Sequence, residues 1–212
     1  ASRRSDSDLP HPCREVGGDW FDYIPLGDGR LGIVLADVSG KGIGAALLMS
    51  SARSVLRLYA DQGLSPGEVL TRMNGILVSD FPSAKFVTLL YAVIDPAGRT
   101  VSIANAGHLY PLLVNGRGTE FIETNSGFPL GIMECRYVTH EIEISSGSRL
   151  FFYTDGVTEA ANAEEEEYGS EKLRMHAGKA GSSVASIFAD IDSFTAGTPA
   201  TDDITVVMIE AV

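Results

Sequence analysis

Four places along the sequence combine a carboxylate with the end of a short apolar run. They are Asp19, Asp37, Asp155 and the pair Asp202-Asp203. A carboxylate at the mouth of a buried strand must be solvated, paired or bound to a cation. Any one of these aspartates could instead cap a helix. Because the arrangement recurs, we favour an oxygen-only anionic cluster, which suits hard divalent cations such as Mg²⁺ or Mn²⁺.

The segments before these aspartates predict how two of them are positioned. Residues 31–36 are continuously apolar and short, which is typical of a strand buried on both faces. Residues 15–25 carry aromatic bulk and predict the preceding strand, and Gly27-Asp28-Gly29 between them predicts a hairpin turn. Asp19 and Asp37 are therefore expected on neighbouring antiparallel strands.

The remaining segments indicate an α+β protein. Residues 45–60 and 65–81 predict a helix pair on one face of a sheet, the second opened by the capping box at Ser65 and Glu68. The first helix is expected to pack through residues at helical spacing with small residues beside them. The spaced residues are Ile43, Leu47, Ser51, Val55 and Leu58, and the small ones are Ala45, Ala46, Ser50 and Ala52. Further strands are expected at 86–95, 100–106, 109–114, 121–124, 137–144, 149–154 and 204–210, with helices at 170–177 and 183–194. Hairpin connections and paired helices favour two antiparallel sheets flanked by helix pairs.

Composition restricts the partners and the location. The 212 residues carry a net charge of −12, which argues against nucleic acid or an anionic membrane as the main partner. No apolar run approaches the roughly 20 residues that span a membrane. Cys13 and Cys135 form neither a metal-ligand spacing nor a disulfide framework, so we expect a reducing, cytoplasmic location. The polar residues 1–12 predict a disordered lead-in or linker before one domain at 13–212.

Six motifs, in this order along the chain, resemble those of the PPM (PP2C-like) serine/threonine phosphatases. The resemblance is to the bacterial branch typified by the sporulation phosphatase SpoIIE and the stress-response phosphatase RsbU, which acts in sigma-factor regulation. The motifs are Gly17-Gly18-Asp19-Trp20-Phe21-Asp22, Asp37-Val38-Ser39-Gly40-Lys41-Gly42, Asn105-Ala106-Gly107-His108, Pro129-Leu130-Gly131, Thr154-Asp155-Gly156-Val157-Thr158-Glu159 and Asp202-Asp203-Ile204-Thr205-Val206-Val207.

The resemblance implies an α-β-β-α sandwich around two Mn²⁺ or Mg²⁺ ions. Asp37 would bridge both ions and the Val38 carbonyl would join it, while Asp19 would act on the first ion directly or through water. Asp155 and Asp202 would hold the second ion. Asp203 stays open as the alternative ligand, and Asp202 is favoured because it matches the aspartate of the family's Asp-Asn pair. Eukaryotic-type members have Asp-Gly-His at residues 37–39, so their histidine general acid is absent.

The implied function is hydrolysis of a phosphoserine or phosphothreonine by a metal-activated water, with Asp37 and Asp155 as catalytic residues. The expected substrate is a phosphorylated STAS-domain (anti-anti-sigma) protein. The resemblance also implies weak metal binding and low basal activity until an N-terminal sensor domain or activator protein acts. A homodimer through the first two helices is left open. The alternatives are a non-catalytic STAS-binding module and a phosphatase of a small phosphorylated metabolite.

Three further residues have a less certain role on sequence alone. Lys41 could contact phosphate, but a solvated loop lysine is the simpler reading. His108 is expected to satisfy backbone groups in a turn more than to act in catalysis. Asp22 is expected to be structural, with ligation of a metal as the lesser alternative.

Overall fold

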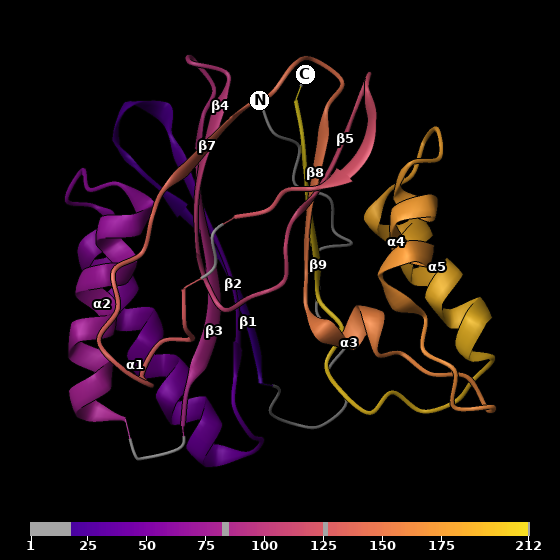
Figure 1. Cartoon of the computed structure of the whole chain (residues 1–212), viewed down its shortest axis with the longest axis horizontal. Helices are drawn as coiled ribbons and strands as arrows, with labels where there is room; N and C mark the ends of the chain where they lie inside the picture. The colour runs from indigo at the N-terminus through magenta and orange to yellow at the C-terminus, as the bar shows by residue number, and fades with distance from the viewer. Residues whose placement is uncertain (1–17, 82–84, 125–126, 212) are drawn as a thin grey trace. The chain divides into compact units, whose positions relative to one another are not determined.

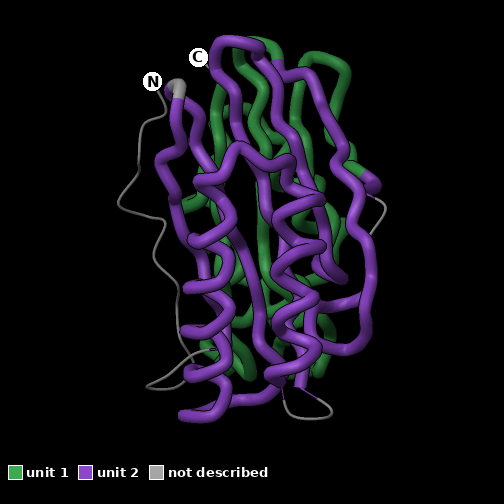
Figure 2. Tube along the Cα trace, turned by 90° about the vertical axis from the view of Figure 1, so that its left-hand side faces the viewer, with its two compact units in different colours: residues 1–15, 109–122, 145–212 green, residues 16–108, 123–144 purple. Residues whose placement is uncertain are grey.

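The computed structural model describes residues 18–81, 85–124 and 127–211 (Figure 1). Figure 2 shows how the chain divides into two compact units. One unit comprises residues 16–108 and 123–144 and is called here the five-stranded unit. The other comprises residues 1–15, 109–122 and 145–212 and is called the four-stranded unit. The predicted lead-in at residues 1–12 lies outside the described residues.

The five-stranded unit is built on an antiparallel sheet in the order β1-β2-β3-β4-β7. Its strands are β1 Asp19–Pro25, β2 Leu31–Val38, β3 Val87–Asp95, β4 Thr100–Ala106 and β7 His140–Glu143. A 3-10 turn at Gly27–Gly29 joins β1 to β2, which confirms the predicted hairpin. β2 and β3 are almost wholly buried, as their continuous apolar runs predict.

Helices α1 (Ile43–Ala60) and α2 (Pro66–Asp80) cover one face of this sheet (Figures 1 and 2). The capping box predicted at Ser65 and Glu68 is present and begins α2. The predicted stripe of α1 is wrong at Ile43, Leu47 and Leu58, which are 77%, 67% and 60% exposed, whereas Val55 packs partly buried against the core. The buried residues of α1 are Ala45, Ala52, Leu56 and Ala60. Ala45 and Ala52 were expected beside that stripe and are buried, and Leu48 and Met49 also pack partly buried against the same core.

The four-stranded unit holds a second antiparallel sheet in the order β6-β5-β8-β9. Its strands are β5 Leu112–Asn115, β6 Gly118–Phe121, β8 Arg149–Tyr153 and β9 Val206–Glu210. The helices of this unit are α3 Asp155–Thr158, α4 Gly169–Ala177 and α5 Val184–Thr195. Side chains from both α4 and α5 share one apolar core with β8 and β9, including Leu173, Ile187, Phe151 and Val206.

The predicted class, α+β with two antiparallel sheets and helix pairs, is confirmed. The strand expected at 121–124 lies instead at Gly118–Phe121, because the turn at 116–117 folds β6 back onto β5. The one-turn helix α3 was not predicted, since four residues carry no periodic signal. None of the helices in the described part of the chain is long and apolar enough to cross a membrane.

Candidate functional site

The two aspartates of the five-stranded unit lie directly opposite each other. Asp19 is the register partner of Asp37 in the β1–β2 ladder. The neighbours Trp20, Ala36 and Val38 belong to the apolar core that includes α1 and α2, so the two carboxylates point to the other face of the sheet. Like charges directly opposite in a ladder are destabilising, and a bound cation would remove that cost.

A set of oxygen atoms surrounds the space beside Gly18. A Cβ atom at Gly18 would lie 3.0 Å from Asp37 Oδ1, 3.4 Å from the Val38 carbonyl and 3.6 Å from the Gly40 carbonyl. The Val38 amide donates to the Gly18 carbonyl at 3.2 Å and fixes β2 against this residue. Carboxylate and carbonyl oxygens are the donors that Mg²⁺ and Mn²⁺ take in proteins, so this donor set fits the expected ions.

The aspartates of the four-stranded unit lie where strands meet loops. Asp155 is the first residue of α3, directly after β8 and Thr154. The Thr154 amide donates to the Thr205 carbonyl at 3.1 Å, and the Thr205 amide donates to Thr154 Oγ1 at 3.1 Å. Gly156 contacts the Asp203 carbonyl so closely that a Cβ atom there would overlap it. These contacts hold the turn after β8 against the segment before β9.

Asp202 and Asp203 differ in their surroundings. Asp203 is 2% exposed, whereas Asp202 is half-buried and its Oδ1 accepts the Asp203 amide at 2.8 Å. Glu159, at the end of α3, has its pKa raised by burial and then by the negative charges of Asp155, Glu167 and Asp202. Asp155 and Asp202 therefore both lie near enough to Glu159 to raise its pKa. The choice of Asp202 over Asp203 as a ligand stays a prediction.

The structure thus places Asp19 opposite Asp37 in one unit, and in the other it holds the segment of Asp155 against the segment of Asp202 and Asp203. Within the residues that the structure describes, no three His, Cys, Asp or Glu side chains form a group that could hold a metal ion. The convergence of the two pairs on one centre stays a prediction. Glu159 belongs to one of the quoted motifs, four residues after Asp155, but it is not among the predicted metal ligands.

The turn that contains His108 is held by Asn105. The buried Asn105 side chain accepts the His108 amide at 2.7 Å and donates to the His108 carbonyl at 3.0 Å and to Thr124 at 2.9 Å. The His108 ring lies 3.0 Å from the Thr88 hydroxyl through Nδ1. Thr88 is the β3 register partner of Asp37. The His108 ring therefore bonds a side chain beside Asp37, and the Asn105 side chain bonds the backbone of this turn.

The Pro129-Leu130-Gly131 motif packs against the start of β3, close to Thr88. Leu130 and Val87 exchange two backbone hydrogen bonds of 2.8 and 3.0 Å. Asn74 on α2 accepts the Gly131 amide at 2.9 Å and donates to the Met133 carbonyl at 2.9 Å. The motif therefore packs against the start of β3, next to the strand that carries Asp37.

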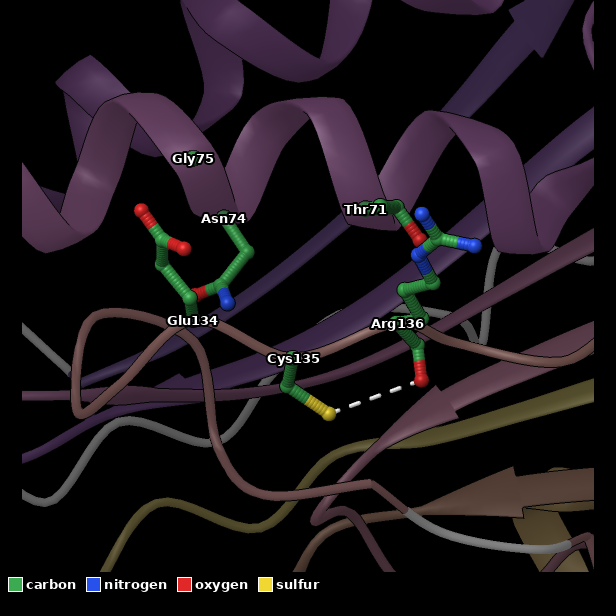
Figure 3. A pocket seen from close by; sticks show the side chains of 6 residues that line it. All are labelled: Thr71, Asn74, Gly75, Glu134, Cys135 and Arg136. Carbon is green, nitrogen blue, oxygen red and sulfur yellow. Dashed lines mark hydrogen bonds between the residues drawn. The ribbon is translucent and has the colours of Figure 1, made fainter.

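A pocket of about 360 Å³ lies between α2 and the chain just after this motif (Figure 3). It is lined by Thr71, Asn74, Gly75, Glu134, Cys135 and Arg136. None of the candidate aspartates lines it, and both polar atoms of the Asn74 amide already bond the backbone. We interpret this pocket as a gap that remains where α2 packs against residues 134–136.

Two of the less certain residues are placed clearly. Asp22 accepts hydrogen bonds from Arg53 at 3.0 Å and from Arg57 at 2.8 and 2.9 Å, so it ties β1 to α1 and is structural. Lys41 is exposed in the loop before α1. A different lysine, Lys85, reaches this loop and donates to the Ser39 carbonyl at 3.1 Å. Sequence reasoning missed Lys85 because it lies 46 residues from Ser39 and belongs to no motif.

The family model described as Stage II sporulation protein E (SpoIIE) matches residues 27–212. Protein IcfG from Synechocystis is 31% identical over 191 residues, which cover 76% of this chain and 30% of that protein. Phosphoserine phosphatase RsbP from Bacillus subtilis is 30% identical over 148 residues, which cover 68% of this chain and 37% of that protein. The chain therefore spans only about a third of the length of these relatives.

Solved structures share the fold. The RsbU and RsbW domains of Rv1364c from Mycobacterium tuberculosis match with a TM-score of 0.79 and 28% identity, over 93% of this chain and 57% of that one. RsbX in complex with magnesium matches with a TM-score of 0.72 and 20% identity, over 94% of this chain and 89% of that one. These matches confirm the PP2C-like fold that the motifs implied.

Proposed function

Because the chain belongs to the SpoIIE family of PP2C-like phosphatases, we propose that it is a metal-dependent protein phosphatase that hydrolyses phosphoserine or phosphothreonine. The observation that supports this most directly is the register pairing of Asp19 with Asp37 beside the oxygen set at Gly18. Two carboxylates directly opposite each other in a ladder repel, and a bound divalent cation would offset that repulsion.

The residues of both units have distinct roles in this proposal. Asp37 and the Val38 carbonyl, with Asp19 directly or through water, would hold one Mn²⁺ or Mg²⁺ ion. Asp155 and Asp202 would hold a second ion together with Asp37. When bound, the two ions supply a water of lowered pKa as the nucleophile and neutralise the charge of the phosphoryl oxygens. The donors lie on paired strands and tightly packed turns, and such rigid support keeps their geometry fixed.

We further propose a phosphorylated STAS-domain protein as the substrate. The support is the resemblance to the RsbU branch, together with a relative that is itself named a phosphoserine phosphatase. The two relatives compared are much longer than the match, so a sensor domain or an activator protein is proposed to raise a low basal activity. A cytoplasmic location is proposed from the cysteine content: the half-buried Cys135 is a free thiol.

The test is hydrolysis of p-nitrophenyl phosphate and of a phosphorylated STAS-domain protein with Mn²⁺, using the 212-residue chain. Asp37→Asn and Asp155→Asn should each lower kcat/KM by about 10³-fold or more, since each loses several kcal/mol of transition-state stabilisation. Asp95→Asn is the matched control, because Asp95 lies at the opposite end of β3 and caps a turn. It should leave the rate unchanged.

The alternatives give different results in the same assay. Full activity in both Asn variants would reject the assignment of these residues. Binding of the phosphoprotein without turnover and without a divalent ion would indicate a non-catalytic module. Faster turnover of small phosphorylated metabolites than of the phosphoprotein would indicate a metabolite phosphatase.

A further inference from the structure

The chain after Asp37 stays paired with β3 for two more residues. The Ser39 amide donates to the Phe86 carbonyl at 2.9 Å, and the Phe86 amide donates to Ser39 Oγ at 2.9 Å. Lys85 precedes Phe86 in the chain, and its side chain reaches Gly40, three residues beyond Asp37. The Lys85 side chain is half-buried, and its ammonium group donates to the Ser39 carbonyl at 3.1 Å.

Gly40 is shaped to receive this ammonium group. Its φ angle is +91°, which disfavours any residue with a side chain. A Cβ atom at Gly40 would also lie 2.6 Å from Lys85 Nζ. The lysine therefore occupies the space that a side chain at residue 40 would fill.

The carbonyl groups of residues 38–40 have two different neighbours, Gly18 and Lys85. The Val38 and Gly40 carbonyls lie near Gly18, together with Asp37 Oδ1, whereas the Ser39 carbonyl between them bonds Lys85. Because a peptide group is planar, the bond to Lys85 holds the plane of the peptide between residues 39 and 40, and each adjoining peptide is attached to that plane through one Cα atom. The lysine bond thus bears directly on where the outer two carbonyls point.

We infer that Lys85 is a positioning residue for a divalent cation at Gly18, and that the Gly40 carbonyl belongs to the same oxygen set as Asp37 and Val38. The inference deepens the proposed function and rests on it only for the identity of the cation. The family resemblance assigns no role to Lys85 or to Gly40.

The sign of the effect separates this role from a simple electrostatic one. A lysine that acted only as a nearby positive charge would repel the cation, so its removal would tighten binding. A lysine that holds the turn makes the opposite prediction, since its removal frees the carbonyls and weakens binding. Residues that orient metal ligands typically change metal affinity by about 10–100-fold when they are removed.

The experiment measures Mn²⁺ affinity of the whole 212-residue chain without substrate, by calorimetry or by electron paramagnetic resonance. Lys85→Met should weaken Mn²⁺ binding by about tenfold or more. Lys85→Arg keeps an N–H donor and should stay close to the unchanged chain. Arg99→Met is the control for net charge, because Arg99 is exposed in the turn between β3 and β4.

Tighter or unchanged Mn²⁺ binding in Lys85→Met would overturn the inference, as would an equal loss in Lys85→Arg or Arg99→Met. No saturable binding by the unchanged chain would overturn it as well. Near-ultraviolet circular dichroism checks folding. If Lys85→Met does not fold, Lys85→Leu, which also lacks a hydrogen-bond donor, replaces it, and weaker Mn²⁺ binding is expected again. Activity is measured separately: a chain that binds Mn²⁺ in a Lys85-dependent way but hydrolyses no phosphoester would refute the proposed function alone.

Discussion

The two units hold their acidic residues by different means. In the five-stranded unit, Asp19 and Asp37 are parts of regular strands, and their separation is set by the β1–β2 ladder. In the four-stranded unit, Asp155 and Asp202 lie just outside the strands, and a close backbone contact between Gly156 and Asp203 joins their segments. The position of Asp19 beside Asp37 depends on the register of β1 and β2, whereas the contact between the segments of Asp155 and Asp202 depends on the absence of a side chain at Gly156.

The two arrangements are sensitive to different substitutions. A ladder with buried apolar residues on β2 and β3 resists a register slip, because a slip by one residue would turn every side chain to the other face. A methyl group added at Gly18, next to Asp37, should therefore displace the oxygen atoms there more than it lowers the stability of the sheet. A methyl group added at Gly156 meets backbone, which cannot move aside without shifting the Asp202-Asp203 segment.

Alanine substitution at Gly156 and at Gly18 should give the largest contrast. Gly156→Ala is expected to cost about 1–3 kcal/mol in the free energy of unfolding, because its Cβ atom overlaps the Asp203 carbonyl. Gly18→Ala meets the Asp37 carboxylate at 3.0 Å, and that side chain can rotate, so its cost should stay below about 1 kcal/mol. Its main effect should be about tenfold weaker Mn²⁺ binding. Denaturant unfolding and Mn²⁺ titration measure the two effects.

Gly75→Ala is the matched control for both variants. Gly75 lies within α2 with open space around its Cα atom, so alanine should stabilise the chain by up to about 1 kcal/mol. An equal loss of stability in Gly156→Ala and Gly18→Ala would show that both acidic regions depend on packing in the same way.

The sequence predicted the strand-held pair better than the loop-held pair. The turn glycines and the apolar run at residues 31–36 were enough to place Asp19 beside Asp37. No comparable local signal connects Asp155 with Asp202, because 47 residues separate them, and only the motif resemblance suggested the pairing. The Asp203 carbonyl at Gly156 is a long-range contact that propensity and periodicity do not encode.

The errors have a shared physical origin. The stripe expected on α1 took the apolar residues at helical spacing, but Ile43 and Leu47 remain exposed, whereas Leu56 and the alanines on another side of the helix are buried. Lys85 was overlooked because its partner is a backbone carbonyl, and a backbone atom leaves no mark in the sequence. Pattern reasoning finds which side chains are apolar, whereas the fit between backbone and side chain appears only in the fold.

The helix pairs offer a second comparison between the units. In the five-stranded unit, Asp22 binds Arg53 and Arg57 of α1 and is 12% exposed. Asp22→Asn should destabilise the chain by about 1–2 kcal/mol, because hydrogen bonds to a charged group exceed neutral ones and the arginines lose their partner. Thermal unfolding measures the loss. Arg53→Met removes one of three hydrogen bonds and should cost less than Arg57→Met, which removes two. Equal losses in the two arginine variants would contradict this account.

In the four-stranded unit the corresponding carboxylate is Asp190 of α5, and its effect should be the smallest and the most dependent on pH. Asp190 accepts the Tyr168 hydroxyl at 2.6 Å and lies 3.0 Å from His176 Nδ1. Burial raises the pKa of Asp190, but the Tyr168 hydrogen bond and the charges of His176 and Lys179 outweigh burial and lower it. An aspartate whose pKa is lowered by folding stabilises the protein above its unfolded pKa, and this contribution is lost as the pH falls through the folded value.

Asp190→Asn should therefore cost less than about 1 kcal/mol at pH 7, since Asp190 is partly exposed and solvent screens its interactions. The difference from the unchanged chain should shrink as the pH falls below 3.8, the ordinary pKa of an aspartate, and vanish below the lowered folded value. Denaturant unfolding at a series of pH values measures this difference. Glu171→Gln on α4 is the control, because the Glu171 side chain is 69% exposed and pairs only locally with Arg174. If Asp190→Asn lowered the stability by the same amount at every pH, Asp190 would act through packing alone and not through its charge.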